Sequence, residues 1–328
     1  MWGNAAQLMI RVTFLAAMVS LFPHCIQNPA SGGKPPTTVI QPPDWELVWS
    51  DEFEDQRLDT AKWSYQVGHG CELGICGWGN NEWEFYTDRP KNVRVEDGSL
   101  VLEAHREIVD SSITALYPGH GSLPIEGGYN WTSKPDTFQH TSARLTTAGK
   151  GDWKFGKIEV RAWIPKGGDG AGCWPAIWML PTGNVYGGWP KSGEMDVMEA
   201  YGPNMDTVHQ TFHWWGGEGT KGSYVQTAKA VRAEGWADDF HVYTLVWAPD
   251  KATAYVDGQA YVTRNNIGSL RQYPYVEDFH LLLNIAIGGA AVRNGTFGLT
   301  EFPQTMKVDY VRIYQDRNLK TETRESGI

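Results

Sequence analysis

Short runs of alternating or continuous apolar residues follow one another along the chain, and turn-forming residues separate them. GKIEVRAWIP alternates polar and apolar positions, as a half-exposed β-strand does. In ATAYVDGQAYV, Asp257 and Gly258 can supply the positive φ values of a tight hairpin turn. Runs of this kind span residues 100–104, 156–165, 176–180, 241–247, 252–256, 281–287 and 306–314. Because no run longer than about ten residues has helical periodicity, the pattern predicts an antiparallel β-sandwich or barrel.

The same pattern divides the chain into four parts. An apolar run follows Arg11 and is too short to span a bilayer comfortably, which is typical of a secretory signal; an uncleaved anchor is the alternative. The predicted parts are a signal peptide (1–30), a linker rich in Pro and Gly (31–43), one folded domain (44–316) and a polar tail (317–328). We therefore expect a secreted, extracellular protein.

Charge and aromatic content narrow the choice of partner. Asp and Glu number 38 against 28 Lys and Arg, so the formal net charge is −10, which disfavours nucleic acid and anionic membranes as partners. The 16 Trp and 14 Tyr residues suit stacking on flat apolar faces such as sugar rings, although a Trp-rich core is the alternative. We expect a monomer that binds neither nucleic acid nor membrane.

Two kinds of covalent modification are predicted. Cys71 and Cys76 in CELGIC are close enough to form a disulfide in an oxidising compartment, which leaves Cys173 as a buried free thiol. The alternative is that all three stay reduced. The sequons at Asn130 and Asn294 lie outside the predicted strands and could carry N-linked glycans.

The stretch GEMDVMEA holds three carboxylates, at Glu194, Asp196 and Glu199. In a regular strand, side chains alternate between faces, so Glu199 would point away from the other two. A β-bulge at Val197 and Met198 would return Glu199 to their face. We therefore expect a bulged strand that presents all three acids together.

This arrangement suits glycosidic bond cleavage. The outer Cα atoms would lie about 13 Å apart, and glutamates leaning together could bring their carboxyl groups to about 5 or 6 Å. That is near the separation of roughly 5 to 5.5 Å found in retaining glycosidases. Asp196 lies between the two glutamates, where it could hydrogen-bond one of them and hold their pKa values apart. The alternatives are an acidic edge strand or a calcium site.

The acidic stretch and the residues before it resemble the catalytic region of glycoside hydrolase family 16, specifically its laminarinase-like endo-1,3-β-glucanases. The matching segment reads GCWPAIWMLPTGNVYGGWPKSGEMDVMEAYG. The likeness spans about residues 45–315 and includes LVWSDEFEDQRLDTAKW, CGWGNNEWEFYT, NVRVEDGSLVLEA, TSARLTT, FGKIEVRAWIPKG, FHVYTLVWAPDKATAYVDG, LLLNIAIGG and MKVDYVRIY. The resemblance implies an all-β jelly-roll sandwich of two curved antiparallel sheets with a concave substrate cleft. It also implies retaining hydrolysis of internal 1,3-β-glucosidic bonds, with β-1,3-glucan as the partner and no catalytic cofactor.

The resemblance also implies a role for each matching residue. Glu194 would be the nucleophile, Asp196 its assisting acid and Glu199 the general acid and base. For the sugar chain, the resemblance implies stacking on Trp174 and Trp178, polar contacts on the non-reducing side with Asn81 and Arg144, and a contact with His213 beyond the cleavage point. It further implies a structural calcium ion bound by Asp309 and the Gly98 carbonyl. The alternatives without substrate contact are that Trp174 and Trp178 are core residues, that Arg144 forms a surface ion pair and that His213 is only packed against its neighbours.

Two segments depart from the family pattern, which leaves the linkage preference open. Adjacent Trp214 and Trp215 stand in HWWGGEGTKGSY, where a Gly-rich segment is expected, and GGDGAGC before Trp174 is longer than usual. The alternative functions are a non-catalytic β-1,3-glucan-binding recognition protein, an enzyme for mixed-linkage 1,3-1,4-β-glucan and an enzyme for algal galactan. Because all three acids are present, the sequence favours an enzyme over a binding protein. The acidic chain has no obvious basic cluster around the motif, which a sulfated galactan would need, so a neutral glucan is the favoured substrate.

Overall fold

The computed structural model describes residues 43–118, 139–165, 172–201, 205–216, 223–232, 235, 238–268, 272–292 and 301–319. The predicted signal peptide, nearly all of the predicted linker and both sequons, at Asn130 and Asn294, lie outside these residues. In the described part, no helix is long and apolar enough to cross a membrane.

The described elements are almost all β-strands. The strands are β1 (Trp45–Asp51), β2 (Ser64–Tyr65), β3 (Phe85–Tyr86), β4 (Val93–Glu96), β5 (Ser99–Arg106), β6 (His140–Ser142), β7 (Arg144–Thr146), β8 (Asp152–Trp153), β9 (Gly156–Trp163), β10 (Cys173–Pro181), β11 (Glu194–Glu199), β12 (Thr207–Gly216), β13 (Ser223–Arg232), β14 (His241–Trp247), β15 (Lys251–Val256), β16 (Gln259–Asn265), β17 (Phe279–Ile287) and β18 (Gln304–Asp316). Helical elements with described bounds are α1 (Ser111–Thr114) and the short 3₁₀ turns at Cys71–Leu73, Cys76–Gly79 and Ala290–Val292.

Each of the seven strand segments predicted from the apolar pattern lies within or overlaps an observed strand, and the predicted hairpin is present between β15 and β16. Asp257 and Gly258 have φ values of 49° and 77°, which confirms the turn chemistry read from the sequence. Positive φ is costly for most residues but is tolerated by Gly and Asp, so these two residue types close the hairpin.

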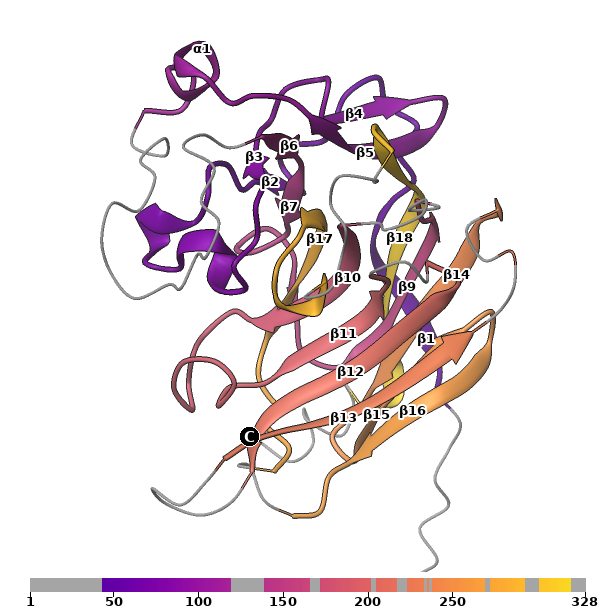
Figure 1. The fold of residues 1–328 in the computed structure, drawn as a ribbon. Coiled ribbons are helices and arrows are strands. Elements are labelled where there is room, and N and C mark those ends of the chain that lie inside the picture. Colours follow the sequence, from indigo (N-terminus) through magenta and orange to yellow (C-terminus); the bar gives the residue numbers. More distant parts are fainter. Residues whose placement is uncertain are drawn as a thin grey trace, which may run out of the picture. The chain divides into compact units, whose positions relative to one another are not determined.

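The strands form two sheets that pack face to face as a jelly roll (Figure 1). Among the described residues, one sheet has the order β16-β15-β14-β9-β18-β5-β6-β3, with β1 and β4 attached, and the other the order β13-β12-β11-β10-β17-β7-β2, with β8 attached. One pair departs from the antiparallel arrangement, because β3 runs parallel to β6. β3 is the edge strand of this sheet and no hairpin joins it to β6, so nothing in their connection forces the pair to be antiparallel.

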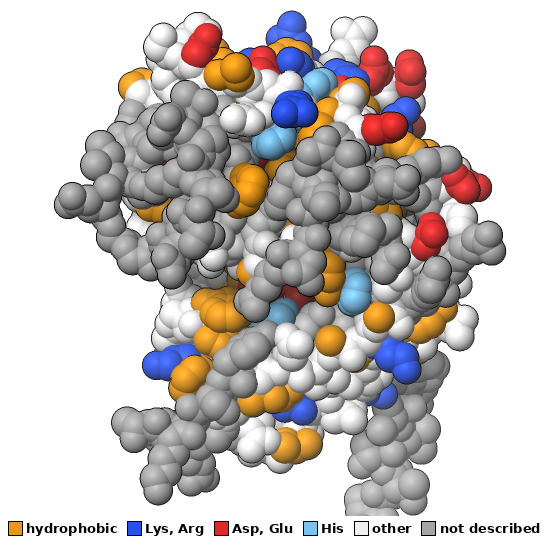
Figure 2. Space-filling model, in the orientation of Figure 1, with side chains coloured by type: hydrophobic (Ala, Val, Ile, Leu, Met, Phe, Trp, Pro, Cys, Tyr) orange, Lys and Arg blue, Asp and Glu red, His pale blue; other side chains and the backbone are white. Residues whose placement is uncertain are grey.

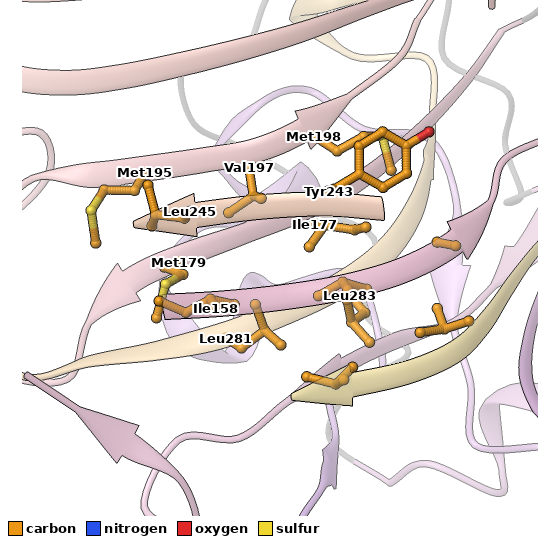
Figure 3. Close-up of a cluster of buried hydrophobic side chains, with 14 of the residues drawn as sticks. Ile158, Ile177, Met179, Met195, Val197, Met198, Tyr243, Leu245, Leu281 and Leu283 are labelled. Carbon is orange, nitrogen blue, oxygen red and sulfur yellow. The ribbon is translucent and has the colours of Figure 1, made fainter. Parts of the chain in front are cut away.

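A continuous hydrophobic core fills the space between the sheets (Figure 3). Its members alternate along the regular strands: β10 contributes Ile177 and Met179, and β17 contributes Leu281 and Leu283. Fully burying a side chain of this size contributes about 1.5 to 3 kcal/mol. The residues between these core positions therefore point to the outer face of β10 and β17, where the polar and aromatic groups of the site lie.

Candidate active site

A β-bulge in β11 places three acids on the outer face of the smaller sheet. Against β12, Asp196 lies opposite Thr211 and Glu199 opposite His209, so Val197 and Met198 together face the single residue between those partners. Met195, Val197 and Met198 are all fully buried in the core. The predicted bulge is therefore present, and it turns Glu199 to the same side as Glu194 and Asp196.

Gln210 supplies the hydrogen bond that the bulge takes from the ladder. Its side chain is fully buried, and its Nε2 donates to the carbonyl of Val197 at 3.0 Å and to that of Tyr255 at 3.1 Å. An unpaired buried carbonyl costs about 1 to 3 kcal/mol. The Gln210 side chain on β12 thus stabilises the bulge in β11, and the positions of the three acids depend on that bulge.

Each glutamate accepts one indole N–H. Trp189 Nε1 donates to Glu194 Oε2 at 2.9 Å, and Trp174 Nε1 donates to Glu199 Oε1 at 2.9 Å. Asp196, only 4% exposed, has its Oδ2 2.7 Å from His213 Nε2, which also lies 3.7 Å from Glu194 Oε1. Figure 2 shows acidic and histidine side chains recessed near the middle of this face, with hydrophobic side chains beside them.

Burial controls the protonation of the three acids. It is the largest cause that raises the pKa of Glu199, to about 8, and the charge of Asp196 adds to it. Burial and Asp196 also raise the pKa of Glu194 well above its ordinary value, while His213 and the Trp189 hydrogen bond act in the opposite direction. Burial likewise raises the pKa of Asp196. Like charges this close cannot all be present at neutral pH, so the group retains at least one proton.

Trp174 and Trp178 lie on the outer face of β10 and are half-buried, so neither is a core residue. Trp178 Nε1 donates to Asn284 Oδ1 at 2.8 Å, which fixes the plane of its ring. Arg144 on β7 is only 4% exposed, and its guanidinium carbon lies 4.9 Å from the Trp178 ring and 4.4 Å from the Trp78 ring. Arg144 is therefore stacked between two indoles rather than held in a surface ion pair.

His213 lies on β12, opposite Glu194 in the ladder. Trp178 lies on β10, the strand on the other side of β11. A second aromatic group lies at the Glu199 end of the same face: the rings of Tyr201 and His209 stack with centroids 4.3 Å apart and planes 13° apart. We did not predict this pair from the sequence. The position of His209 four residues before His213 on an alternating strand was the available signal.

Asn81 is exposed, with φ of 59°, and its predicted contact with sugar stays a prediction. Its neighbour Asn80 is half-buried and donates Nδ2 to Glu82 Oε1 at 3.1 Å. Glu82 and Glu84 are both buried, at 2% and 0% exposure, and were missed by the sequence reasoning. Two acids spaced by two residues within the aromatic run NEWEFY were the signal that could have indicated them.

Cys71 and Cys76 form the predicted disulfide, and Cys173 is a buried free thiol. In the described part of the chain, Glu194, Asp196 and His213 offer three ligand atoms within 4.8 Å of one another, a spacing that could also hold a cation. Asp309, predicted with Gly98 to bind calcium, accepts a hydrogen bond on Oδ2 from Arg161 Nη1 at 2.7 Å.

Comparisons with known proteins agree with this geometry. Residues 80–312 match the model of glycosyl hydrolases family 16. A β-glucanase from Rhodothermus marinus is 38% identical over 283 residues, which cover 83% of this chain and 86% of the relative. A glucan endo-1,3-β-glucosidase from Cryptopygus antarcticus is 35% identical over 82% of this chain and 91% of its own.

Solved structures show the same likeness. The laminarinase catalytic domain from Thermotoga maritima is 38% identical and superposes with a TM-score of 0.67, covering 83% of this chain and 99% of that domain. The match extends over most of both chains and includes the bulged strand with its three acids. The chain therefore belongs to glycosyl hydrolases family 16.

Proposed function

We propose that this protein is an endo-acting β-glucanase that hydrolyses internal 1,3-β-glucosidic bonds of laminarin-like glucans by retaining double displacement. The observation that carries the proposal is the bulge in β11, which brings Glu194 and Glu199 to one face with Asp196 between them. The β-glucanase among the similar proteins supports the activity, and the endo-1,3-β-glucosidase supports the linkage.

In the first step, Glu194 attacks the anomeric carbon while Glu199 protonates the oxygen of the leaving sugar. Glu199 suits the acid role because its pKa of about 8 keeps it protonated at neutral pH, and the Trp174 hydrogen bond to Oε1 leaves Oε2 to carry the proton. Glu194 suits the nucleophile role because Trp189 and His213 both favour its ionised form. Asp196 lies beside Glu194 and can share a proton with it.

In the second step, Glu199 is a carboxylate and removes a proton from water, which attacks the same anomeric carbon and releases Glu194. Two displacements at one carbon restore the β configuration. Both steps use only carboxyl groups and water, so no cofactor takes part in catalysis.

The aromatic groups supply the sugar platforms of this proposal. Trp174 and Trp178 present indole faces beside the acids, and stacked aromatic rings suit the apolar faces of glucose units. In this proposal Arg144 donates hydrogen bonds to hydroxyl groups on the non-reducing side. His213, which pairs with Glu194 across the ladder, contacts the leaving sugar. We assign Asn81 to the non-reducing side as a further polar contact because it matches the family pattern.

The deciding experiment measures reducing ends released from laminarin by the purified protein, with Glu199→Gln as the matched inactive control. Products of several sizes at early times indicate endo action. A glucan-binding recognition protein would bind laminarin without releasing reducing ends. Mixed-linkage glucan and agar-type galactan, assayed in parallel, test the other substrates, and faster hydrolysis of either would overturn the proposed linkage.

We also propose that the protein is secreted as a monomer. The apolar segment after Arg11 and the Cys71–Cys76 disulfide, which suits an oxidising compartment, support secretion. Glycans at Asn130 and Asn294 stay predictions, and an unchanged mass after peptide N-glycosidase F treatment would contradict them.

A calcium ion at Gly98 and Asp309 stays a prediction that the described contacts fit only in part, because Arg161 already takes one carboxylate oxygen of Asp309. An ion there would have to bind through the other oxygen. A melting temperature that EDTA leaves unchanged would exclude it.

A further inference from the structure

Two buried carboxyl groups lie behind the sugar platforms. Glu82 and Glu84 precede β3 and, being two residues apart in extended chain, can face the same side. They are 2% and 0% exposed, and the two side chains interact with each other. Two carboxylates this close, out of water, repel strongly, so the pair needs a proton between them.

The surroundings of Glu82 suit a carboxylate. Asn80 Nδ2 donates to Oε1 at 3.1 Å and the Tyr86 hydroxyl donates to Oε2 at 3.1 Å. The positive charge of Arg144 also attracts Glu82. An ionised carboxyl group only accepts hydrogen bonds, and here both of its oxygens are offered donors.

The surroundings of Glu84 suit a protonated, neutral carboxyl group. Its Oε2 accepts the backbone N–H of Ile287 at 2.5 Å. Its Oε1 is buried, and among the described residues no donor reaches it. A buried carboxylate oxygen without a donor carries its full desolvation cost. A protonated Oε1 removes that cost, because it can itself donate to Glu82.

Hydrogen bonds connect this pair to a sugar platform. Asn284 Nδ2 donates to the Tyr86 hydroxyl at 3.1 Å, and Trp178 Nε1 donates to Asn284 Oδ1 at 2.8 Å. Glu82, Tyr86, Asn284 and Trp178 therefore form one chain. Gly289 packs between Glu82 and the second platform, Trp174. A side chain at this position would crowd both, because its Cβ atom would lie 3.4 Å from Glu82 Cγ and 3.3 Å from the Trp174 ring.

We propose that Glu84 keeps a proton that it donates to Glu82, and that this neutral and ionised pair positions Arg144 and Trp178 for sugar binding. Glu82 and Glu84 are positioning residues, since they act through other side chains and touch neither the sugar nor the reacting atoms. The identity of the sugar rests on the proposed function, whereas the shared proton does not.

The electrostatics agree with this assignment. Burial is the largest cause that raises the pKa of both acids; for Glu84 the charge of Glu82 adds to it, and for Glu82 Arg144 opposes it. The other titratable groups near the pair are Tyr86, whose pKa burial raises, and His69, whose pKa burial lowers and whose Nε2 contacts the Glu82 carbonyl at 3.0 Å. The proton therefore belongs on Glu84 at neutral pH.

The first test measures the melting temperature of wild type and Glu84→Gln from pH 5 to pH 9. A group whose pKa is raised on folding stabilises the fold fully below its unfolded pKa, about 4.3, and loses that contribution as pH rises through the folded value. Glutamine is always neutral and can donate to Glu82. We expect the melting temperature of wild type to fall progressively relative to the variant as pH rises. A difference that is constant with pH would overturn the proposal.

Glu107→Gln is the matched control for that test. Arg89 and Thr141 lower the pKa of Glu107 to about 2, although burial raises it, so Glu107 is ionised throughout the range. Its melting-temperature difference from wild type should therefore not change between pH 5 and pH 9. Equal slopes for the two variants would mean that the Glu84 effect is not specific, and would also overturn the proposal.

The second test measures the affinity for a laminari-oligosaccharide by calorimetry at pH 6, with Glu199→Gln in every protein to prevent turnover. Adding Glu82→Gln removes the charge that holds Arg144 and Tyr86, so we expect Kd to rise about tenfold. Adding Glu84→Gln should change Kd much less than adding Glu84→Leu, which cannot donate. Equal effects of Gln and Leu at Glu84 would exclude the donor role.

The two tests separate this inference from the proposed function. If wild type fails to hydrolyse laminarin, the proposed function is wrong, but the melting curves still report the proton on Glu84. If wild type is active and the Glu84→Gln curve is parallel to that of wild type, only the inference is wrong. Should Glu82→Gln fail to fold, the comparison of Gln with Leu at Glu84 still decides it.

Discussion

The indole nitrogen of Trp189 donates a hydrogen bond to Glu194 Oε2 at 2.9 Å, although the Trp189 ring is 58% exposed. A hydrogen bond to a carboxylate favours its ionised form, so losing it raises the pKa of Glu194. Because the proposed nucleophile is active when ionised, we expect the acidic limb of kcat/KM in Trp189→Phe to move to higher pH. The pH profile of laminarin hydrolysis measures this shift, and an unchanged acidic limb would contradict the role of Trp189.

Trp174→Phe should move the alkaline limb of the pH profile of kcat/KM. Trp174 donates to Glu199 and opposes the rise of its pKa to about 8. Glu199 is active as an acid when protonated, so wild type should lose kcat/KM as pH rises through about 8. Without the indole donor this pKa rises further, and the alkaline limb moves to higher pH. If Trp174→Phe shifts the acidic limb instead, Glu199 is not the acid.

Azide distinguishes the two glutamates. In Glu194→Ala, with an activated aryl β-glycoside, azide should attack the anomeric carbon directly and give the α-glycosyl azide. In Glu199→Ala the covalent intermediate still forms on Glu194, so azide should give the β-glycosyl azide. Proton NMR of the anomeric signal reads the outcome. A β-azide from the Glu194 variant would mean that the two roles are reversed.

Amide variants test the same assignment by rate. Glu194→Gln and Glu199→Gln should each lower hydrolysis of laminarin by several orders of magnitude, because each removes a step that contributes about 10² or more. Asp196→Asn should cost less. More than about a tenth of the wild-type rate in either glutamine variant would remove that residue from the mechanism.

Arg144→Lys tests the stack between Trp78 and Trp178. A guanidinium is planar and stacks on indole faces, whereas an ammonium cannot fill the same space. We expect KM for laminari-oligosaccharides to rise several-fold with a smaller change in kcat. Arg161→Lys is the control: Arg161 belongs to β9 of the larger sheet and its guanidinium lies over the Phe240 ring, so the substitution should leave KM unchanged.

Gln210→Leu tests the support of the bulge. The substitution leaves the Val197 carbonyl without its side-chain donor, so we expect the free energy of unfolding to fall by about 1 to 3 kcal/mol. Urea unfolding measures the loss. Activity should fall as well if the bulge relaxes, because Glu199 would turn toward the core.

The bulge itself could be predicted because a regular β11 would bury Glu199 in the core without a partner, which is too costly. The hairpin at Asp257 and Gly258 was predictable because its signal is local. The parallel pairing of β3 with β6 was not, because strand partners depend on contacts between residues far apart in sequence. Trp189 is only five residues before Glu194, but the contact between them depends on the path of the turn that joins them, which the alternation of apolar and polar residues does not reveal.

The role of Glu82 and Glu84 was hidden for a related reason. Sequence shows two acids beside aromatic residues, but their burial depends on β17 and β7 covering them. Arg144 shows the reverse case: a contact with sugar was predicted, whereas its stack between two indoles required Trp78, which comes from a different loop.

β1 and β18 pair along their length, with Trp45 opposite Asp316, and the Asp44 N–H donates to Asp316 Oδ1 at 3.0 Å. The two ends of the folded domain are therefore neighbours in one sheet, while the acids lie on the other sheet. A short peptide could join these ends, so new termini could be opened in an exposed turn such as the one at Asp257 and Gly258. Attachment of the enzyme to a solid support near Asp44 or near Asp316 should likewise leave the substrate face accessible to long polysaccharide chains.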